Sequence, residues 1–242
     1  MRISGPGNSV YFTTWLTTPQ SVISQSSTSA QMLMSAHNTG ESGVPGVMNY
    51  QVRAQVYING GSQTVANNGI TVSGAASATI VLSIASSFNS YRDGSGGDAS
   101  GRNSATFAAL PTTDFDTLFA RHKTAWQGFF NRFSIDLGNV ASLSSLATDV
   151  RIQKAMAVPD LGLISLFVNY GRALLIGSSG PLAVQPANLQ GIWQNQLSVL
   201  WQRYVVFLPP EHNGYLGANT CFCSKFTINI NVCSVFVRCP VL

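Results

Sequence analysis

The first part of the chain alternates apolar and polar residues at a spacing of two, which is typical of β-strands with one buried face. Four segments show this alternation or a run of β-favouring residues: Val10–Leu16, Tyr50–Ile58, Ile70–Gly74 and Ala78–Ala85. Asn59-Gly60-Gly61 follows the second segment and is typical of a hairpin turn. Short strands separated by turns rich in Gly, Ser and Asn predict part of an antiparallel β-sandwich over residues 1–92.

The apolar spacing changes to three and four residues in the second half of the chain. A segment rich in Gly, Ser and Asp comes first, and it predicts a flexible linker over residues 93–112. Thr113-Asp114 is a plausible N-cap for a helix that runs to about Phe133, and a second, short helix is expected from Asp149 to about Ala157. We therefore expect residues 113–157 to be helical.

A third helix is expected after Pro159, because proline is favoured in the first turn of a helix. It should end at the segment from Gly177 to Pro181, which combines glycine, serine and proline. Apolar residues lie on most of its faces, so we expect this helix to be buried.

Charged residues make up only 9% of the chain, and Ser, Thr, Asn, Gln and Gly take their place. The net charge of +4 reflects scarce acids and not a basic cluster, so we expect no nucleic-acid partner. No apolar run reaches about 18 residues, so we expect no membrane span. Residues 1–11 lack the features of a signal peptide. An uncharged polar surface is common in secreted proteins that handle neutral glycans.

All four cysteines lie after residue 220, at Cys221, Cys223, Cys233 and Cys239. A disulfide framework normally spreads through the fold that it links. The spacings C-x-C and C-x5-C also differ from the C-x2-C pairs of common zinc sites. The four cysteines could form a zinc site, or they could belong to a tail whose origin differs from that of the rest of the chain. We favour the separate tail. We expect no metal and no cofactor.

Two stretches carry the candidate chemistry. Pro186-Ala187-Asn188-Leu189-Gln190-Gly191-Ile192-Trp193 places two amides and a tryptophan close together, which suggests the floor of a sugar-binding cleft. In Phe226–Asn231, Asn229 and Asn231 are one residue apart in an extended run, which sends both amides to the same face. Bland alternatives are a strand-end asparagine pair and, for Trp193, a core aromatic.

Together these stretches resemble glycoside hydrolase family 95, the α-L-fucosidase family. Further segments similar to that family, in the same order, are Gly43–Gly46, Ala120–Lys123, Phe129–Phe133, Ala147–Ile152 and Phe167–Ile176. The resemblance implies a mixed β plus α fold: part of an N-terminal antiparallel β-sandwich, then linker helices, then the start of a catalytic (α/α)6 barrel over residues 158–231.

The resemblance also implies inverting hydrolysis of terminal α-L-fucosyl linkages, with a fucosylated glycan as substrate and secretion of the parent protein. In the family a glutamic acid protonates the leaving oxygen, and an aspartate helped by two asparagines activates water. Those asparagines correspond to Asn229 and Asn231, and substrate would meet Asn188, Gln190 and Trp193. Amide side chains suit this role, because an inverting site keeps a water between its carboxyl groups.

The chain departs from the family in two respects. None of its acids matches the family's catalytic acid or base, so we expect a fragment, truncated at both ends and inactive alone. Residues 203–223 and 232–242 also leave the family pattern, as translated introns or as a loop insertion and a divergent tail. Alternative functions are a non-catalytic carbohydrate-binding or structural sandwich protein, and a mis-spliced product without a role.

Overall fold

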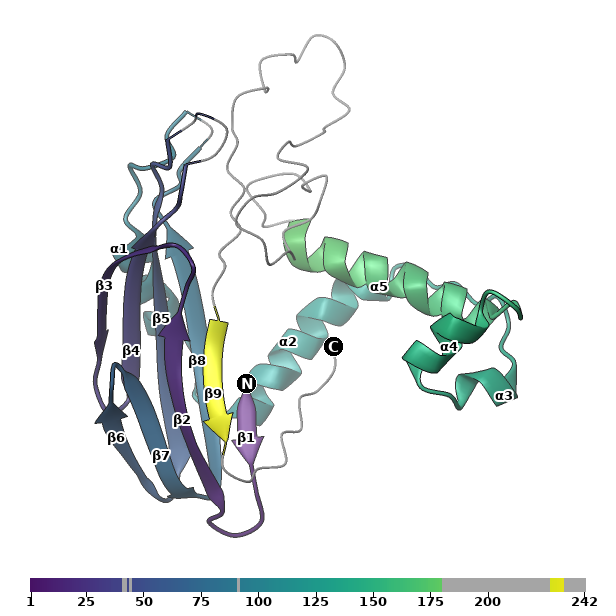
Figure 1. The fold of residues 1–242 in the computed structure, drawn as a ribbon, viewed down its shortest axis with the longest axis horizontal. Helices are drawn as coiled ribbons and strands as arrows, with labels where there is room; N and C mark the ends of the chain where they lie inside the picture. Colours follow the sequence, from purple (N-terminus) through teal and green to yellow (C-terminus); the bar gives the residue numbers. More distant parts are fainter. Residues whose placement is uncertain (41–42, 44, 91, 180–226, 233–242) are drawn as a thin grey trace. The chain divides into compact units, whose positions relative to one another are not determined.

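The computed structural model describes residues 1–40, 43, 45–90, 92–179 and 227–232 (Figure 1). These residues fall into two compact units. Residues 1–119 and the strand at 227–232 belong to the first unit, and residues 120–179 belong to the second. Each unit is described by itself below.

The first unit contains two antiparallel sheets (Figure 1). The five-stranded sheet has the order β1-β8-β5-β4-β3, and the four-stranded sheet has the order β6-β7-β2-β9. The strands are β1 Arg2–Ser4, β2 Val10–Thr17, β3 Ser21–Ser27, β4 Gln31–His37, β5 Asn49–Asn59, β6 Ser62–Ala66, β7 Gly69–Ala75, β8 Ser77–Ser86 and β9 Thr227–Val232. Antiparallel sheets followed by helices confirm the predicted mixed β plus α fold class, and the start of a catalytic barrel stays a prediction.

One buried core joins the two sheets, because alternate residues of each strand point into it. In β2, Val10, Phe12, Thr14 and Leu16 are buried, while the residues that alternate with them are exposed or only partly covered. The other sheet contributes large residues such as Met34 and Val52 to the same core. The four segments that alternation predicted as strands all lie within strands of these sheets, namely β2, β5, β7 and β8.

The predicted hairpin at Asn59-Gly60-Gly61 is wrong. The chain does turn there, since both glycines have positive φ, but β5 and β6 belong to different sheets. A side chain at Gly61 would come within 2.4 Å of the Ser73 carbonyl oxygen, so the crossing between sheets needs glycine. The tight hairpin instead joins β6 to β7, where Asn67 and Asn68 both adopt positive φ.

The expected linker at residues 93–112 contains a helix, α1, at Ala99–Ala108. Its glycine-rich sequence suggested flexibility, but Asp98 caps the helix by accepting a hydrogen bond from the Gly101 amide at 2.9 Å. Asn103 is fully buried against the five-stranded sheet. Its amide donates to the Gln51 carbonyl at 2.8 Å and accepts from the Ser83 hydroxyl at 2.7 Å. These contacts hold α1 on β5 and β8.

Four further helices follow: α2 Phe115–Phe130, α3 Ala141–Ser144, α4 Thr148–Lys154 and α5 Leu161–Ser179. The predicted N-cap of α2 is confirmed, because the Asp114 carboxylate accepts a hydrogen bond from the Thr117 amide at 2.8 Å. Helices α4 and α5 occupy the positions expected from the apolar spacing, and α3 was not predicted.

The predicted burial of α5 is wrong, because none of its residues is buried. Phe167 and Tyr170 are the most exposed of its large side chains. Among the described residues α5 is the one helix that is long and apolar enough to cross a membrane, judged by length and composition alone. An interior helix of a water-soluble domain meets the same criterion. Helix α5 also contains a charged residue, Arg172.

Candidate functional site

Two of the five site residues predicted from sequence, Asn229 and Asn231, lie among the described residues. Asn188, Gln190 and Trp193 lie outside the described residues, as do all four cysteines. Asn229 and Asn231 lie in β9, so the expected extended backbone is confirmed. Their roles in chemistry stay predictions.

Strand β9 pairs antiparallel with β2, and its register sets Asn229 opposite Trp15 and Asn231 opposite Thr13. The resemblance had assigned residues 158–231 to the start of a barrel. In the structure the backbone of this segment's last residues is hydrogen-bonded into the four-stranded sheet. The two asparagine positions are therefore tied to a strand near the beginning of the chain.

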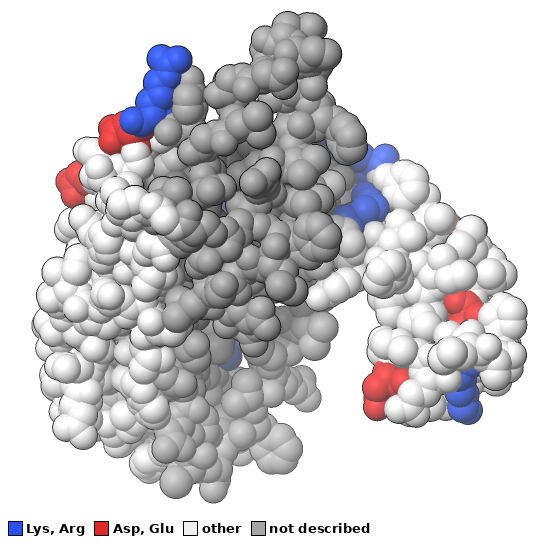
Figure 2. Space-filling model, turned by 45° about the horizontal axis from the view of Figure 1, so that its top comes forward, with Lys and Arg blue, Asp and Glu red and all other residues white. Residues whose placement is uncertain are grey.

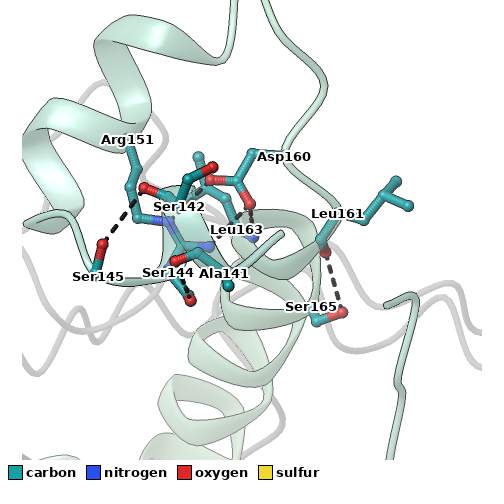
Figure 3. A network of polar contacts seen from close by, with 9 residues as sticks. All are labelled: Ala141, Ser142, Ser144, Ser145, Arg151, Asp160, Leu161, Leu163 and Ser165. Atoms are coloured by element: carbon teal, nitrogen blue, oxygen red, sulfur yellow. Dashed lines mark hydrogen bonds and ion pairs between the residues drawn. The ribbon is translucent and has the colours of Figure 1, made fainter. Parts of the chain in front are cut away.

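The second unit contains a buried ion pair between α4 and the start of α5 (Figure 3). Arg151 Nε and Nη2 each donate over 2.8 Å to a different carboxylate oxygen of Asp160. The two side chains are 10% and 2% exposed. A side chain at Gly162 would come within 3.0 Å of Arg151 Nη2 and 2.8 Å of Asn139 Oδ1, so glycine leaves room for the pair.

Asp160 also caps α5, because its Oδ1 accepts a hydrogen bond from the Leu163 amide at 2.9 Å. The hydrogen bonds from Arg151 are the main reason that the pKa of Asp160 is lowered to about 2, against the opposing effect of burial. The same pairing raises the pKa of Arg151. A carboxylate held in its ionised form is a poor proton donor near neutral pH, so this pair connects two helices and does not resemble a catalytic acid.

A second arginine connects α5 to the C-terminal end of α2. Arg172 Nη2 donates to the Phe130 carbonyl at 2.6 Å, and Nη1 donates to Asn169 Oδ1 at 3.0 Å. Its guanidinium carbon lies 4.6 Å from the ring centre of Phe130 and 4.7 Å from that of Phe133. A cation at a helix C-terminus and above aromatic rings is favourable on both counts.

The remaining carboxylates with contacts in the described residues serve local structure. Four of them accept a hydrogen bond from a backbone amide two or three residues later in the chain, namely Asp93, Asp98, Asp114 and Asp136. Hydrogen bonds, led by that from Asn89, lower the pKa of Asp93, and those from Thr117 lower the pKa of Asp114. Asp116 pairs with Arg2 at 2.7 Å.

The pKa values of Asp93, Asp114 and Asp160 are all lowered, which is the opposite of what a general acid needs. Within the same residues, no group of three or more His, Cys, Asp or Glu side chains is arranged to hold a metal ion. Figure 2 shows that charged side chains are few and scattered on the visible face.

Comparison with known proteins identifies the helical part of the chain. Residues 114–207 match the profile of the glycosyl hydrolase family 95 catalytic domain. This stretch is therefore similar to part of a family 95 catalytic domain. The family match covers α2 to α5 and extends beyond the described helices. It also runs a few residues past Arg203, where the sequence interpretation placed the first departure from the family pattern.

Two curated proteins are similar to part of this chain over alignments of 91 and 87 residues. The chain is 37% identical over 91 residues to "Alpha-L-fucosidase 2" of Arabidopsis thaliana. It is 31% identical over 87 residues to "Probable alpha-fucosidase A" of Aspergillus niger. Each alignment covers 36% of this chain and 11% of the relative. The chain thus matches about a tenth of the length of these proteins.

Arg151 and Arg172 both lie in segments that resemble the family, but the sequence pattern assigned neither of them a role. The sequence did contain a sign of the role of Arg151. This arginine lies in a predicted short helix, nine residues before Asp160 at the start of the next helix, and could therefore form an ion pair with that aspartate. The stacking of Arg172 depends on how α5 crosses the end of α2, and local sequence does not specify that.

Proposed function

We propose that this chain is part of a glycoside hydrolase that releases terminal α-L-fucose from glycans with inversion. The supporting observation is the family 95 match over residues 114–207, together with two relatives whose names are those of fucosidases. The parent protein is proposed to be secreted, and the reaction needs no cofactor.

In this proposal Asn188, Gln190 and Trp193 contact the sugar, and Asn229 and Asn231 orient the attacking water. An amide can both donate to and accept from a water molecule without adding charge to the site. The proton donor and the base would come from parts of the parent protein that this chain does not contribute. We therefore expect no turnover of a chromogenic α-L-fucoside by the 242-residue chain alone.

A chimera tests the function directly. Residues 114–207 would replace the corresponding segment of the Arabidopsis relative, and hydrolysis of 4-nitrophenyl α-L-fucoside would be measured. We expect the chimera to retain activity, and we expect Asn188→Ala or Trp193→Ala within it to raise KM. An exposed residue of the same segment, Tyr170, provides the control as Tyr170→Phe. The proposal would be contradicted by a folded chimera without activity, or by an active chimera whose KM is the same with and without Asn188→Ala and Trp193→Ala.

A non-catalytic glycan-binding role is a second candidate, and one observation favours it. The four strands of the sheet that contains β2 hold no charged residue. A surface of this composition suits a neutral, hydroxyl-rich ligand better than a charged one.

A further inference from the structure

The four-stranded sheet has an outward face that takes no part in the family 95 match. In β2 the buried residues alternate with Tyr11, Thr13 and Trp15, which project away from the core. The neighbouring strand β7 sets Thr71 opposite Thr13, and Thr71 in turn lies opposite Thr64 of β6. These residues, together with Ser62 and Ser73 in the adjacent register, define the outward face.

Two aromatic side chains lie on this face. Tyr11 is 49% exposed and Trp15 is half-buried. Four residues apart on one strand, they are separated by about 13 Å along β2. The phenol end of Tyr11 reaches over Gly74, where a glycine with positive φ leaves the space open. The face thus offers two aromatic surfaces in line.

Hydroxyl groups fill the space between and beside the rings. Thr13 Oγ1 and Thr71 Oγ1 are hydrogen-bonded to each other at 2.9 Å. Each hydroxyl has one hydrogen and two acceptor lone pairs, so this pair keeps the capacity to bond outward. Thr64 and the Ser62–Ser73 register pair extend the row across the sheet.

Charge is absent from the strands of this sheet and present in those of the other. Strands β2, β6, β7 and β9 contain no Asp, Glu, Lys, Arg or His. The five-stranded sheet contains Arg2, His37 and Arg53. A face without charge offers no electrostatic attraction to nucleic acid, anionic lipid or acidic peptide. Aromatic rings and hydroxyls without charge complement a ligand that has C–H faces and many hydroxyl groups.

We propose that the outward face of the four-stranded sheet binds a neutral oligosaccharide chain, with Tyr11 and Trp15 packing against sugar C–H faces. Thr13, Thr64 and Thr71 exchange hydrogen bonds with the sugar hydroxyls. The choice of a glycan rests in part on the proposed function. The proposed site includes none of the residues expected to contact the hydrolysed sugar, and it would hold the chain of a larger substrate.

Binding by the full 242-residue chain tests the proposal, with isothermal titration calorimetry as the measurement. The probes are cellohexaose, maltohexaose and lacto-N-fucopentaose, with tetragalacturonate as the anionic comparison. We expect at least one neutral probe to bind and tetragalacturonate to bind more weakly. Tyr11→Ala should raise the dissociation constant on the order of tenfold, since a truncated aromatic anchor loses most of its contact area.

Two further variants keep the test independent of folding. Thr71→Val preserves shape and removes one hydroxyl, and we expect it to weaken binding several-fold. Tyr170→Ala is the matched control, because Tyr170 is 60% exposed on α5 in the other unit, and its binding should equal that of the wild type. Circular dichroism establishes that each variant is folded.

Three results would overturn the proposal: no binding of any neutral probe, tighter binding of tetragalacturonate, or unchanged binding in both Tyr11→Ala and Thr71→Val. The chimera experiment is read separately, since it contains none of these strands. Failure of fucoside hydrolysis in the chimera and failure of glycan binding here are therefore distinguishable.

Discussion

Arg151 and Asp160 form an ion pair in which two guanidinium nitrogens each reach a separate carboxylate oxygen at 2.8 Å. The pair joins the short helix α4 to the first turn of α5. Asp160 serves both the arginine and a helix amide, so one carboxylate sets the start of α5 and its connection to the preceding helix. The planar, bidentate geometry also explains why lysine is not an equivalent residue at position 151.

Loss of this carboxylate should destabilise the second unit. Asp160→Asn removes the negative charge and one of the two charge-assisted hydrogen bonds, which leaves a guanidinium covered without its counter-ion. We expect a thermal midpoint lower by about 5 °C or more, with faster amide exchange in α4 and α5. Asp149→Asn, at an exposed position of α4, is the control and should change little. Equal midpoints for the two variants would contradict this role for the ion pair.

The same ion pair predicts a dependence of stability on pH. The pKa of Asp160 is lowered from its ordinary value of 3.8 to about 2, so the folded state binds this proton less readily than the unfolded state. The stabilisation is therefore fully present above about pH 4 and is lost as the pH falls through about 2. Amide exchange of α5 should differ between wild type and Asp160→Asn at about pH 5. The difference should vanish near the lower pKa, and a constant difference across this range would refute the assignment.

Substitution of glycine by alanine should have opposite effects on stability at Gly128 and at Gly61. Gly128 lies in α2 with open space where a methyl group would be added, so Gly128→Ala should stabilise the helix by roughly 0.5 to 1 kcal/mol. Gly61 has φ of +71°, and a methyl group there would meet the Ser73 carbonyl oxygen. Gly61→Ala should destabilise the first unit by roughly 1 to 3 kcal/mol. Denaturant unfolding followed by amide exchange in α2 and β7 measures both effects. Two variants that both raise or both lower the free energy of unfolding would contradict the expectation.

Truncation of Ile70 should destabilise the core between the two sheets. This side chain is fully buried in β7, and Ile70→Ala should lower the free energy of unfolding by about 2 to 5 kcal/mol through lost burial and a residual cavity. Val65 lies directly opposite on β6 but is 52% exposed, so Val65→Ala should have an effect of about 0.5 kcal/mol or less. Urea titration with circular dichroism gives both values. Similar effects at the two positions would show that the core does not include β7 as described.

Asn103 should control the attachment of α1 to its sheet. Asn103→Ala leaves the Ser83 hydroxyl and the Gln51 carbonyl without this partner, which costs about 1 to 3 kcal/mol. We expect amides of α1 to exchange faster while those in the centre of β5 stay protected. Thr106→Ala, on the exposed side of the same helix, provides the control. Unchanged exchange in α1 for Asn103→Ala would show that other contacts hold the helix.

The spacing of apolar residues predicted those elements in which buried residues recur at a regular interval along the sequence. Strand β5 is an example, since every second residue from Tyr50 to Val56 is buried and the sequence alternates accordingly. Strand β3 was missed because it lies at a sheet edge and is exposed along most of its length, so no apolar period marks it. Strand β4 was missed because Met and Ala, which favour helices, occupy its buried positions.

Other features depend on contacts between distant segments. Helix α1 has a glycine-rich sequence, and its stability comes from Asn103 reaching β5 and β8, which local composition does not reveal. The crossing at Gly60–Gly61 has the sequence of a hairpin, and only the packing of two sheets decides that the chain changes layer. For the candidate site, sequence predicted the extended backbone of Asn229 and Asn231 but not the pairing of that strand with β2.

The pairing of β9 with β2 has a consequence for synthesis on the ribosome. The five-stranded sheet is complete once β8 has emerged, whereas β2 ends at Thr17 and its neighbour β9 begins only at Thr227. One side of β2 must therefore wait for β9, with its backbone amides and carbonyls open to other partners, while residues 18–226 are made. During that interval β2 is a site where a nascent chain could pair with a strand from another molecule, and chaperone protection would matter most there.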